Sequence, residues 1–508
     1  MGVARVASRA QLGLSAPRVD VEVHLGGGLP VFSIVGMPAT AVRESKDRVR
    51  AALATSGFEW PAGRITVNLS PADLPKEGCR YDLPIALGIL LASSQISVPE
   101  ERLAASEFYG ELGLAGELRP IRGVLLAAAH AAREQRALVV PAGNVFEARI
   151  AAPRIFAADS LLGVCALAQS DAAVDVAETL ARPARPASAA ELADVRGQAV
   201  PKRALIIAAA GGHSLLLVGP PGTGKSMLAQ RLPGILPPLA ADEALEVAGI
   251  ASVSARGFSA EEFGRRPFRA PHHTASAGAI IGGGRGVRPG EVSLAHRGVL
   301  FLDELPEFNR SVLESLREPL ESGVVAISRA SAQVEYPARF QLVAAMNPCP
   351  CGYLGEPTGN CRCAPPEIAR YRARISGPLL DRIDLRVTVS AVASDELLDD
   401  VAEGPGNLTT GVVAAQVLAA RQRQMSRAGK LNAELAGREL RKFCSLSREA
   451  RVLLGQLRVK FELSARGVHR VLRVARTIAD LADAGSGADD APLAAGHLAE
   501  ALQLRRAI

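Results

Sequence analysis

The 508-residue sequence predicts an α/β fold in three successive parts: a mixed α/β region, a second α/β region and a helical end. Three observations lead to this prediction. The first region alternates apolar and polar residues, as strands do, with helical stretches in between. The second contains short apolar runs, "LLLV" and "VLFL", each followed by small or polar residues. The remainder of the chain repeats apolar positions at the helical period.

The first region is expected to form a domain over residues 1–168. Alternation in "RVDVEVHLGGGLPVFSIV" predicts strands with the glycines at a turn. A helix follows in "ATAVRESKDRVRAALATSG" and ends at Gly57. Next, "RITVNLSP" predicts a strand and "DLPIALGILLAS" an apolar helix. This domain is therefore mixed α/β.

A linker is expected at residues 169–190, because "QSDAAVDVAETLARPARPASAA" has few large apolar residues and two Arg-Pro pairs. The second α/β domain then covers residues 191–390. Residues 391–508 are expected to be helical and include the arginine-rich stretch "GVHRVLRVARTIADLADAG".

Composition narrows the class of protein. The hydrophobic fraction of 48% predicts a globular protein, and the net charge of +6 permits nucleic-acid binding without requiring it. Neither an apolar run of about 18 residues nor an N-terminal signal sequence is present, so no membrane contact and a cytoplasmic location are expected. In that compartment, clustered cysteines more often bind metal than form disulfides.

The stretch "LLLVGPPGTGKSMLAQRL" has the pattern of a phosphate-binding loop between a strand and a helix. Its glycines let backbone amides surround phosphate oxygens, Lys225 reaches the β and γ phosphates of ATP, and Ser226 ligates Mg²⁺. A chance match is disfavoured by the strand and helix on either side. The predicted nucleotide-binding residues are Gly219, Pro220, Pro221, Gly222, Thr223, Gly224, Lys225 and Ser226.

Two further apolar runs end in polar residues that suit ATP hydrolysis. In "GVLFLDELPEF", Asp303 can hold Mg²⁺ and Glu304 can deprotonate the attacking water. In "RFQLVAAMNPCPCG", Asn347 can hold that water near the γ-phosphate. The alternatives are a surface carboxylate pair and a turn-forming asparagine before Pro348. Arg382 and Arg466 can stabilise transition-state charge, often from a neighbouring subunit, although by composition alone each is a surface arginine.

Cys349, Cys351, Cys361 and Cys363 form two C-x-C pairs. Four thiolates complete a tetrahedral zinc shell, and such a closed site is structural. The alternative is a loop of free thiols.

These motifs together resemble the magnesium-chelatase-like AAA+ ATPases of the ComM/YifB family. The resemblance rests on "RPFRAPHHTASAGAIIGGG", "PGEVSLAHRGVLFLDELPEF", "YPARFQLVAAMNPCPCG" and "RISGPLLDRIDL", and it extends over nearly the whole chain. It implies a Lon-protease-like (ribosomal-protein-S5-like) α+β domain first. An AAA+ core with a helix-2 insert and a pre-sensor-1 hairpin follows, and a helical lid ends the chain. It also implies a hexamer that hydrolyses ATP with Mg²⁺ and drives DNA branch migration during natural transformation, together with recombination proteins.

Carried over residue by residue, the resemblance implies roles for named side chains. Asp303 and Glu304 match Walker B, Asn347 sensor 1, Arg382 the arginine finger and Arg466 sensor 2. "DVRGQ", residues 194–198, matches the segment beside the adenine.

The helix-2 insert and the hairpin carry the candidate DNA contacts Arg285, Arg288 and Arg329, for which subunit packing is the alternative. His272 and His273 are expected to point apart on a strand, which disfavours a metal site there. The Lon resemblance suggests peptidase activity as a possible function. However, Leu125 occupies the position of the catalytic lysine, and the segment that would hold the catalytic serine, "PKEGCRYD", contains Cys79 and no serine. A DNA-binding or assembly platform is expected instead. The rival functions are a magnesium-chelatase motor subunit and a MoxR-like protein remodeller.

Overall fold

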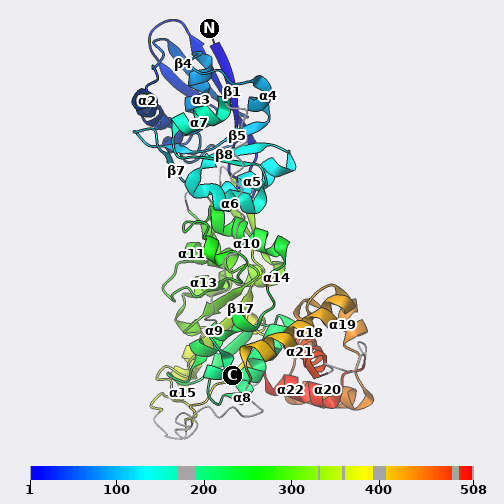
Figure 1. Cartoon of the computed structure of the whole chain (residues 1–508). Helices are drawn as coiled ribbons and strands as arrows, with labels where there is room; N and C mark the ends of the chain where they lie inside the picture. Colours follow the sequence, from blue (N-terminus) through cyan, green and yellow to red (C-terminus); the bar gives the residue numbers. More distant parts are fainter. Residues whose placement is uncertain are drawn as a thin grey trace.

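The computed structural model describes residues 2–169, 190–284, 287–329, 332–356, 361–392, 408–482 and 491–505. The chain is elongated: the N-terminal part lies at one end, the central α/β part follows it, and the C-terminal helices lie to one side of the central part (Figure 1). All but the two ends of the expected linker, residues 169–190, falls outside the described residues. Among the described helices, none combines the length and the hydropathy that crossing a bilayer requires.

The N-terminal part begins with a four-stranded sheet in the order β1-β2-β4-β3. β1 (Gly2–Arg9) and β2 (Arg18–Gly26) are antiparallel, and so are β2 and β4 (Arg64–Ser70), whereas β3 (Phe32–Val35) runs parallel to β4. The expected turn at the glycines is a longer connection, because β4 lies between β2 and β3. Helices α1 (Thr40–Arg43), α2 (Ser45–Thr55) and α3 (Asp82–Ala92) complete this half, and α3 is buried along nearly its whole length.

A second, three-stranded parallel sheet follows within the same part. It has the order β5-β8-β9, formed by Ser106–Phe108, Ala137–Pro141 and Ile155–Ala158. Sequence patterning did not separate this sheet from the first. The accompanying elements are α4 (Glu100–Ala104), β6 (Glu111–Leu112), β7 (Leu118–Arg119), α5 (Val124–Arg133), α6 (Val145–Ala151) and α7 (Leu161–Gln169).

The central part is a five-stranded sheet in the order β11-β14-β17-β10-β18, and every neighbouring pair is parallel. Its strands are Phe268–Arg269, Val299–Leu302, Gln341–Met346, Leu215–Val218 and Leu385–Thr388. β10, β14 and β17 are fully buried, as expected for a parallel sheet covered on both faces. Helices α8 (Ala199–Gly211), α9 (Lys225–Ile235), α10 (Ala241–Val253), α13 (Arg310–Ser315), α14 (Arg317–Ser322), α15 (Pro365–Arg372) and α16 (Gly377–Leu380) surround it.

Two insertions are present where the sequence predicts them. The first contains α11 (Ala277–Ile281), the short hairpin β12 (Gly282–Gly283)–β13 (Arg288–Pro289) and α12 (Glu291–Leu294). The second is the antiparallel hairpin of β15 (Val324–Arg329) and β16 (Ala332–Pro337).

The C-terminal part is helical, as expected. It consists of α18 (Thr410–Ala428), α19 (Arg438–Phe443), α20 (Arg448–Lys460), α21 (Ala465–Ala482) and α22 (Ala495–Gln503). Its apolar side chains join one continuous core with α8, α9 and β10. Figure 1 shows α18 and α21 against the central part and α19 and α20 further out.

The N-terminal part packs directly on the central part through α10 and the β15–β16 hairpin. The buried carboxylate of Glu147 accepts hydrogen bonds from the Ser252 hydroxyl at the end of α10 and from the Leu125 amide, 3.2 Å away. At the β1–β2 turn, Gly13 has a φ of 59° and lies so close to Val334 that a Cβ would be 2.2 Å from it. The two parts are therefore in close, well-packed contact.

Candidate functional site: a nucleotide site and a cysteine cluster

The sheet order brings three predicted site segments to one edge. β10, β17 and β14 are neighbours and parallel, so the polar segments that follow their carboxyl ends lie side by side. The loop after β10 needs glycine where the chain enters α9, because Gly222 and Gly224 have φ values of 79° and 86°. The amide of Gly219 donates to the carbonyl of Met346, the residue before Asn347, at 3.2 Å.

Lys225 is buried at the centre of this edge. Its Nζ donates to the carbonyls of Gly219 and Pro220 at 2.7 and 2.6 Å, and to Oδ1 of Asn347 at 3.2 Å. Burial lowers the pKa of Lys225, while Asp303 and Glu304 oppose that shift. The ammonium group is thus held within the loop by neutral oxygens that a phosphate can replace.

The two predicted Mg²⁺ ligands lie together: the Ser226 hydroxyl donates to Oδ2 of Asp303 at 2.6 Å. A hydroxyl and a carboxylate at this position are oxygen ligands of the kind Mg²⁺ prefers. The next residue, Glu304, has a φ of 52°, a conformation that costs a non-glycine residue about 1–3 kcal/mol and is concentrated at functional sites. Its amide donates to Oδ1 of Asp303 at 2.9 Å.

The histidine pair differs from its prediction. His272 and His273 do not lie on a strand and do not point apart; they follow β11 in a turn, with ring centroids 4.1 Å apart. The loop geometry turns both rings to one side, and Nδ1 of His273 lies 3.0 Å from Oε2 of Glu304. Sequence reasoning missed this contact with the site, because "HHT" carries no motif that links it to a carboxylate about thirty residues away.

The segment expected beside the adenine borders a cavity of about 460 Å³. Gln198 begins α8 and donates from Nε2 to the carbonyls of Thr223, at 3.4 Å, and Ser390, at 2.6 Å. This joins the cavity to the phosphate loop. No sequence signal identified the residues after β18 or Gln503 as part of it. The lining is formed by Gln198, Ala199, Val200, Pro201, Arg386, Val387, Thr388, Ser390, Ala391, Val392 and Gln503.

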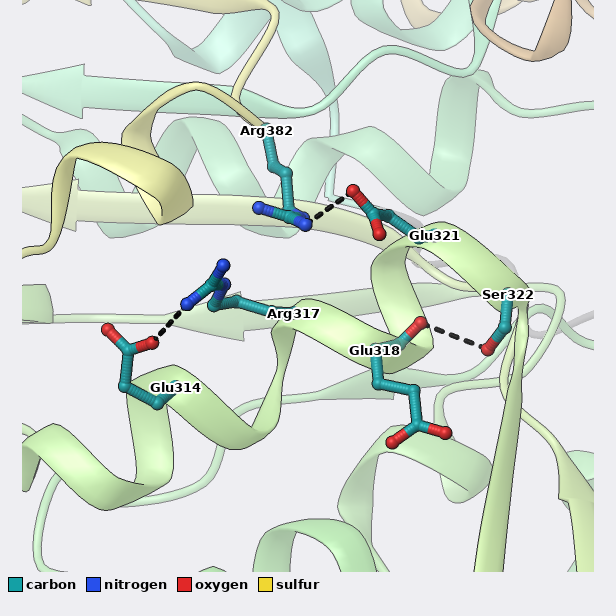
Figure 2. Close-up of a pocket in the computed structure, with 6 residues that line it drawn as sticks. All are labelled: Glu314, Arg317, Glu318, Glu321, Ser322 and Arg382. Atoms are coloured by element: carbon teal, nitrogen blue, oxygen red, sulfur yellow. Dashed lines mark hydrogen bonds and ion pairs between the residues drawn. The ribbon is translucent and has the colours of Figure 1, made fainter.

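Arg382 lies at the opposite end of the sheet from this chain's phosphate loop. β18 runs parallel to β10 with Leu385 opposite Leu215; the loop follows the carboxyl end of β10, whereas Arg382 precedes the amino end of β18. The guanidinium points at Glu321 of α14 and forms an ion pair with it (Figure 2). It lines a cavity of about 350 Å³ with Glu314, Arg317, Glu318, Glu321 and Ser322.

Arg466 starts α21 and is exposed. One turn further along, Arg470 donates to the carbonyl of Arg382 at 2.9 Å and to Oδ1 of Asp384 at 2.5 Å. The Arg382 carbonyl also accepts from the Ser214 hydroxyl at 2.8 Å. The start of α21 therefore lies at the same end of the sheet as Arg382, so neither predicted arginine is beside this chain's own Lys225.

The two insertions pack on each other. The Tyr336 hydroxyl of β16 donates to the Val287 carbonyl at 2.8 Å, and a Cβ on Gly282 would lie 2.8 Å from Ile327. Arg288 is exposed on this pair of hairpins, and Arg329 is the last residue of β15. Arg285 lies outside the described residues.

The N-terminal part offers little for proteolysis. Burial raises the pKa of Cys79 to about 11, so its thiol stays protonated at neutral pH and is a poor nucleophile. Leu125, at the position where a catalytic lysine was considered, is buried in the core. The expectation that this domain is non-proteolytic stays a prediction.

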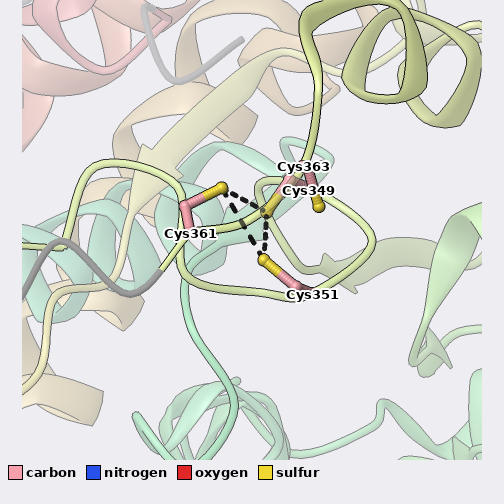
Figure 3. A group of neighbouring side chains, drawn as sticks. All are labelled: Cys349, Cys351, Cys361 and Cys363. Carbon is pink, nitrogen blue, oxygen red and sulfur yellow. Dashed lines mark hydrogen bonds between the residues drawn. The ribbon is translucent and has the colours of Figure 1, made fainter.

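The four clustered cysteines converge on one point (Figure 3). The sulfur of Cys349 lies 3.3 Å from that of Cys351 and 3.7 Å from that of Cys361, and all four sulfurs are within 4.8 Å of one another. Among the described residues, this is the one group of three or more His, Cys, Asp or Glu side chains that gathers in this way. Backbone amides of Tyr353 and Arg362 donate to Cys351 and lower its pKa to about 6.

Family models agree with the three-part organisation. Models of the magnesium chelatase subunit ChlI match residues 191–397 and residues 21–144, and a model of the ChlI C-terminal region matches residues 407–505. A partial match of 29% identity joins about a third of this chain to the magnesium-chelatase 67 kDa subunit of Heliobacterium mobile.

Longer matches cover the chain from end to end. The protein YifB of Salmonella typhimurium is 47% identical over 99% of this chain and 97% of its own length. Competence protein ComM of Haemophilus influenzae is 46% identical over 99% of this chain and 98% of its own. With identity at this level over both full lengths, the chain belongs to the magnesium-chelatase-like family of ComM and YifB proteins.

Proposed function

We propose that this chain is one subunit of an ATP-driven hexameric AAA+ motor that moves branch points in DNA recombination intermediates, as in natural transformation. Recombination proteins are its expected partners and the cytoplasm its location. The observation that carries the proposal is the division of one ATP site between two ends of the sheet. Lys225, Ser226, Asp303 and Asn347 gather at one end, and Arg382 lies at the other.

Hydrolysis would use the gathered residues in separate roles. Lys225 exchanges its carbonyl partners for phosphate oxygens, and Ser226 and Asp303 would hold Mg²⁺. That ion, when bound with the nucleotide, neutralises charge on the phosphates. Glu304 accepts the proton of the attacking water, and Asn347 orients that water through the amide that now contacts Lys225.

The position of the arginines supports a ring. A finger that stabilises transition-state charge must reach the γ-phosphate, and Arg382 precedes β18 at the far end of the sheet from its own phosphate loop. It serves the neighbouring subunit's nucleotide, and the exposed Arg466 reaches the same interface. On assembly, Arg382 exchanges Glu321 for phosphate oxygens.

DNA is the favoured substrate because both insertions carry arginines and pack against each other. The two hairpins are joined by packing and by the Tyr336–Val287 hydrogen bond, so Arg288 and the strands β15 and β16 lie close together. A closed ring of such surfaces suits an anionic strand, which a motor holds by its phosphates. This chain is 46% identical to a protein that is named for competence, which supports a role in DNA uptake or recombination. The N-terminal domain, Lon-protease-like in our proposal, would be a platform for DNA or assembly.

A protein-remodelling motor, of the magnesium-chelatase or MoxR type, is the second candidate. The match to a magnesium-chelatase subunit over about a third of this chain favours it. Such a motor would use the same ATP site, so the two candidate functions differ in the molecule that is moved, which is DNA in one case and a partner protein in the other.

The decisive experiment measures ATP hydrolysis with no DNA and with single-stranded, duplex and four-way-junction DNA, using Glu304→Gln as the inactive control. Stimulation by DNA and junction processing that requires ATP would support the DNA motor. ATP hydrolysis that is indifferent to every DNA, with no junction processing, would overturn it in favour of the remodeller.

A further inference from the structure

The cysteine cluster has the dimensions of a single tetrahedral metal site. Zinc–sulfur bonds of about 2.3 Å place the four sulfurs of such a site about 3.8 Å apart. The sulfur–sulfur distances of 3.3, 3.7 and 3.7 Å among Cys349, Cys351 and Cys361 approach that value, and Cys363 lies within the same 4.8 Å group. No disulfide is formed in the cluster.

We propose that Cys349, Cys351, Cys361 and Cys363 bind one Zn²⁺ ion per chain, and that this ion fixes Asn347 and Pro221 at the ATP site. The second half of this inference rests on the proposed ATPase function; the first half does not. Four thiolates with no open position are typical of structural zinc, and binding releases the thiol protons. Sulfurs this close together enclose a single ion and leave no room for a multi-iron cluster.

The cluster is joined to the nucleotide site by the backbone. Cys349 is buried and follows Asn347 by two residues. The amide of Gly352 donates to the Cys349 carbonyl at 3.0 Å, which closes a tight turn between the first two ligands. Between Asn347 and Cys349, the carbonyl of Pro348 accepts a hydrogen bond from the guanidinium of Arg372 at 3.3 Å. The position of Asn347 therefore depends on the fold of this loop.

A second contact reaches the phosphate loop itself. Gly352 has a φ of 89°, and a Cβ there would lie 2.7 Å from the ring of Pro221 and 3.8 Å from the Asn347 amide carbon. The turn between the zinc ligands thus packs against both walls of the nucleotide site. An ion that ties Cys349 and Cys351 to Cys361 and Cys363 holds this turn in place.

Without the ion, no coordinate bond joins the two ligand pairs, which nine residues of glycine- and proline-rich sequence separate. The Gly352 turn can then move away from Pro221. Asn347 then loses the packing of the Gly352 turn against its side chain. The expected result is an ATP site that binds nucleotide more weakly and turns over more slowly.

The first experiment measures metal. The full-length protein, purified without chelator, is analysed by elemental mass spectrometry, beside Cys361→Ser, Cys361→His and the control Cys79→Ser. Cys79 is a partly buried thiol in the N-terminal domain, outside the cluster. We expect about one zinc per chain in wild type, Cys79→Ser and Cys361→His, because three thiolates and one imidazole also bind zinc. Cys361→Ser is expected to lose most of it.

Cobalt replacement identifies the ligands. Co²⁺ added to zinc-free protein should give the sulfur-to-metal charge-transfer band and visible bands of a tetrahedral thiolate site, weakened in Cys361→Ser. Zinc or cobalt binding below half an equivalent, iron in place of zinc, or a Cys349–Cys351 disulfide in the protein purified under reducing conditions would each overturn the zinc site.

The second experiment tests the link to the ATP site. Fluorescent-ATP binding and turnover are measured in zinc-loaded protein, in protein stripped by a chelator, and after zinc is returned. We expect stripped protein to bind nucleotide at least about threefold more weakly, with recovery on reloading, while the far-ultraviolet circular dichroism is unchanged. Unchanged nucleotide affinity after zinc loss would overturn the link. A zinc-bound protein that never hydrolyses ATP would instead refute the motor and leave the metal site standing.

Discussion

Nδ1 of His273 lies 3.0 Å from Oε2 of Glu304, the residue proposed to deprotonate the attacking water. The contact fixes one carboxylate oxygen and leaves the other free for water. Since a partly exposed ion pair contributes up to about 1 kcal/mol, His273→Ala should lower the turnover number by up to roughly 5-fold. ATP affinity should stay the same, because His273 touches none of the phosphate-loop residues predicted to bind nucleotide.

His273→Asn, which keeps an N–H donor, should recover part of the lost rate. His272→Ala is the matched control, since His272 bonds to Thr274 and not to Glu304. A wild-type turnover number in His273→Ala would show that the contact does not orient the carboxylate.

Phosphate binding and water activation should separate in two variants. Lys225→Ala should lose nucleotide binding, because the buried ammonium is the cation nearest the loop carbonyls. Glu304→Gln should bind ATP and stay assembled, yet lose about 10²- to 10⁴-fold in turnover, the usual contribution of a general base. Equilibrium binding of fluorescent ATP and steady-state phosphate release measure the two effects. Wild-type turnover in Glu304→Gln would refute its assignment.

Arg382 should act on the neighbouring subunit's nucleotide. Arg382→Ala should lower ATP turnover by about 10³- to 10⁵-fold, as expected for an arginine finger. Mixing it with Lys225→Ala should restore some activity, because one interface type in the mixed ring has an intact loop and an intact finger. Arg317→Ala, which changes the other arginine of the same cavity, is the matched control. Mixed rings that form but stay inactive would count against action between subunits.

The grouping of the proposed nucleotide-site residues at one edge of the sheet was predictable because its sequence signals are local. Glycines, Lys225 and Ser226 occur at fixed spacing between a strand and a helix, and parallel strands bring the ends of β14 and β17 beside them. Contacts between distant segments carry no such signal. His273 with Glu304, Arg382 with Glu321, and the cavity wall after β18 each depend on how loops meet in space.

In the fold, too, local features were predictable and the pairing of distant segments was not. Alternation identified β2 and β3, but nothing in their sequence placed β4 between them, because strand order depends on pairing between distant segments. The second N-terminal sheet was hidden for a related reason. Its strands are only three to five residues long and buried, and short apolar runs do not distinguish strand from helix.

Asp384 should link acid stability to the lid. Burial raises its pKa, but His213 and Arg470 bond to it and lower the pKa well below the ordinary value of 3.8. A depressed carboxyl stabilises the fold above its unfolded pKa and loses that effect as pH falls. Asp384→Asn should therefore reduce stability at pH 7 by up to about 3–5 kcal/mol, since it removes the carboxylate partner of the Arg470 guanidinium.

Chemical denaturation from pH 8 to pH 3 checks this prediction. The gap between wild type and Asp384→Asn should be constant down to about pH 5 and narrow below about pH 4, where the carboxyl of the unfolded chain binds a proton and the native carboxyl does not. Asp381→Asn, an exposed change on the same segment, should leave the midpoint unaltered throughout. A gap that widens in acid would contradict the depressed pKa.

DNA binding should be electrostatic and should depend on the paired hairpins. A motor that advances along a strand holds phosphates, so the logarithm of affinity should fall linearly with the logarithm of salt, by about 0.7–0.9 per neutralised phosphate. Arg288 is exposed on the hairpin that packs against β15–β16, and Arg285 belongs to the same tip in the sequence. Changing both to alanine should lower the slope by up to about two units and uncouple ATP hydrolysis from strand movement.

Arg256→Ala is the matched control: its side chain is 66% exposed on the central part, outside both hairpins. Fluorescence anisotropy at four or five salt concentrations gives the slopes, and mass photometry tests whether the proposed hexamer remains assembled. If the two arginines contact phosphates, the slope should fall in the double variant and stay the same in Arg256→Ala. An arginine that contacts no phosphate contributes nothing to the counterion release on binding, so its removal does not change the slope. An unchanged slope would move the contacts to Arg329 or the N-terminal domain. If the DNA affinity of the wild type did not depend on salt, the protein would not bind the phosphate backbone of DNA. The protein-remodelling motor would then be the preferred function.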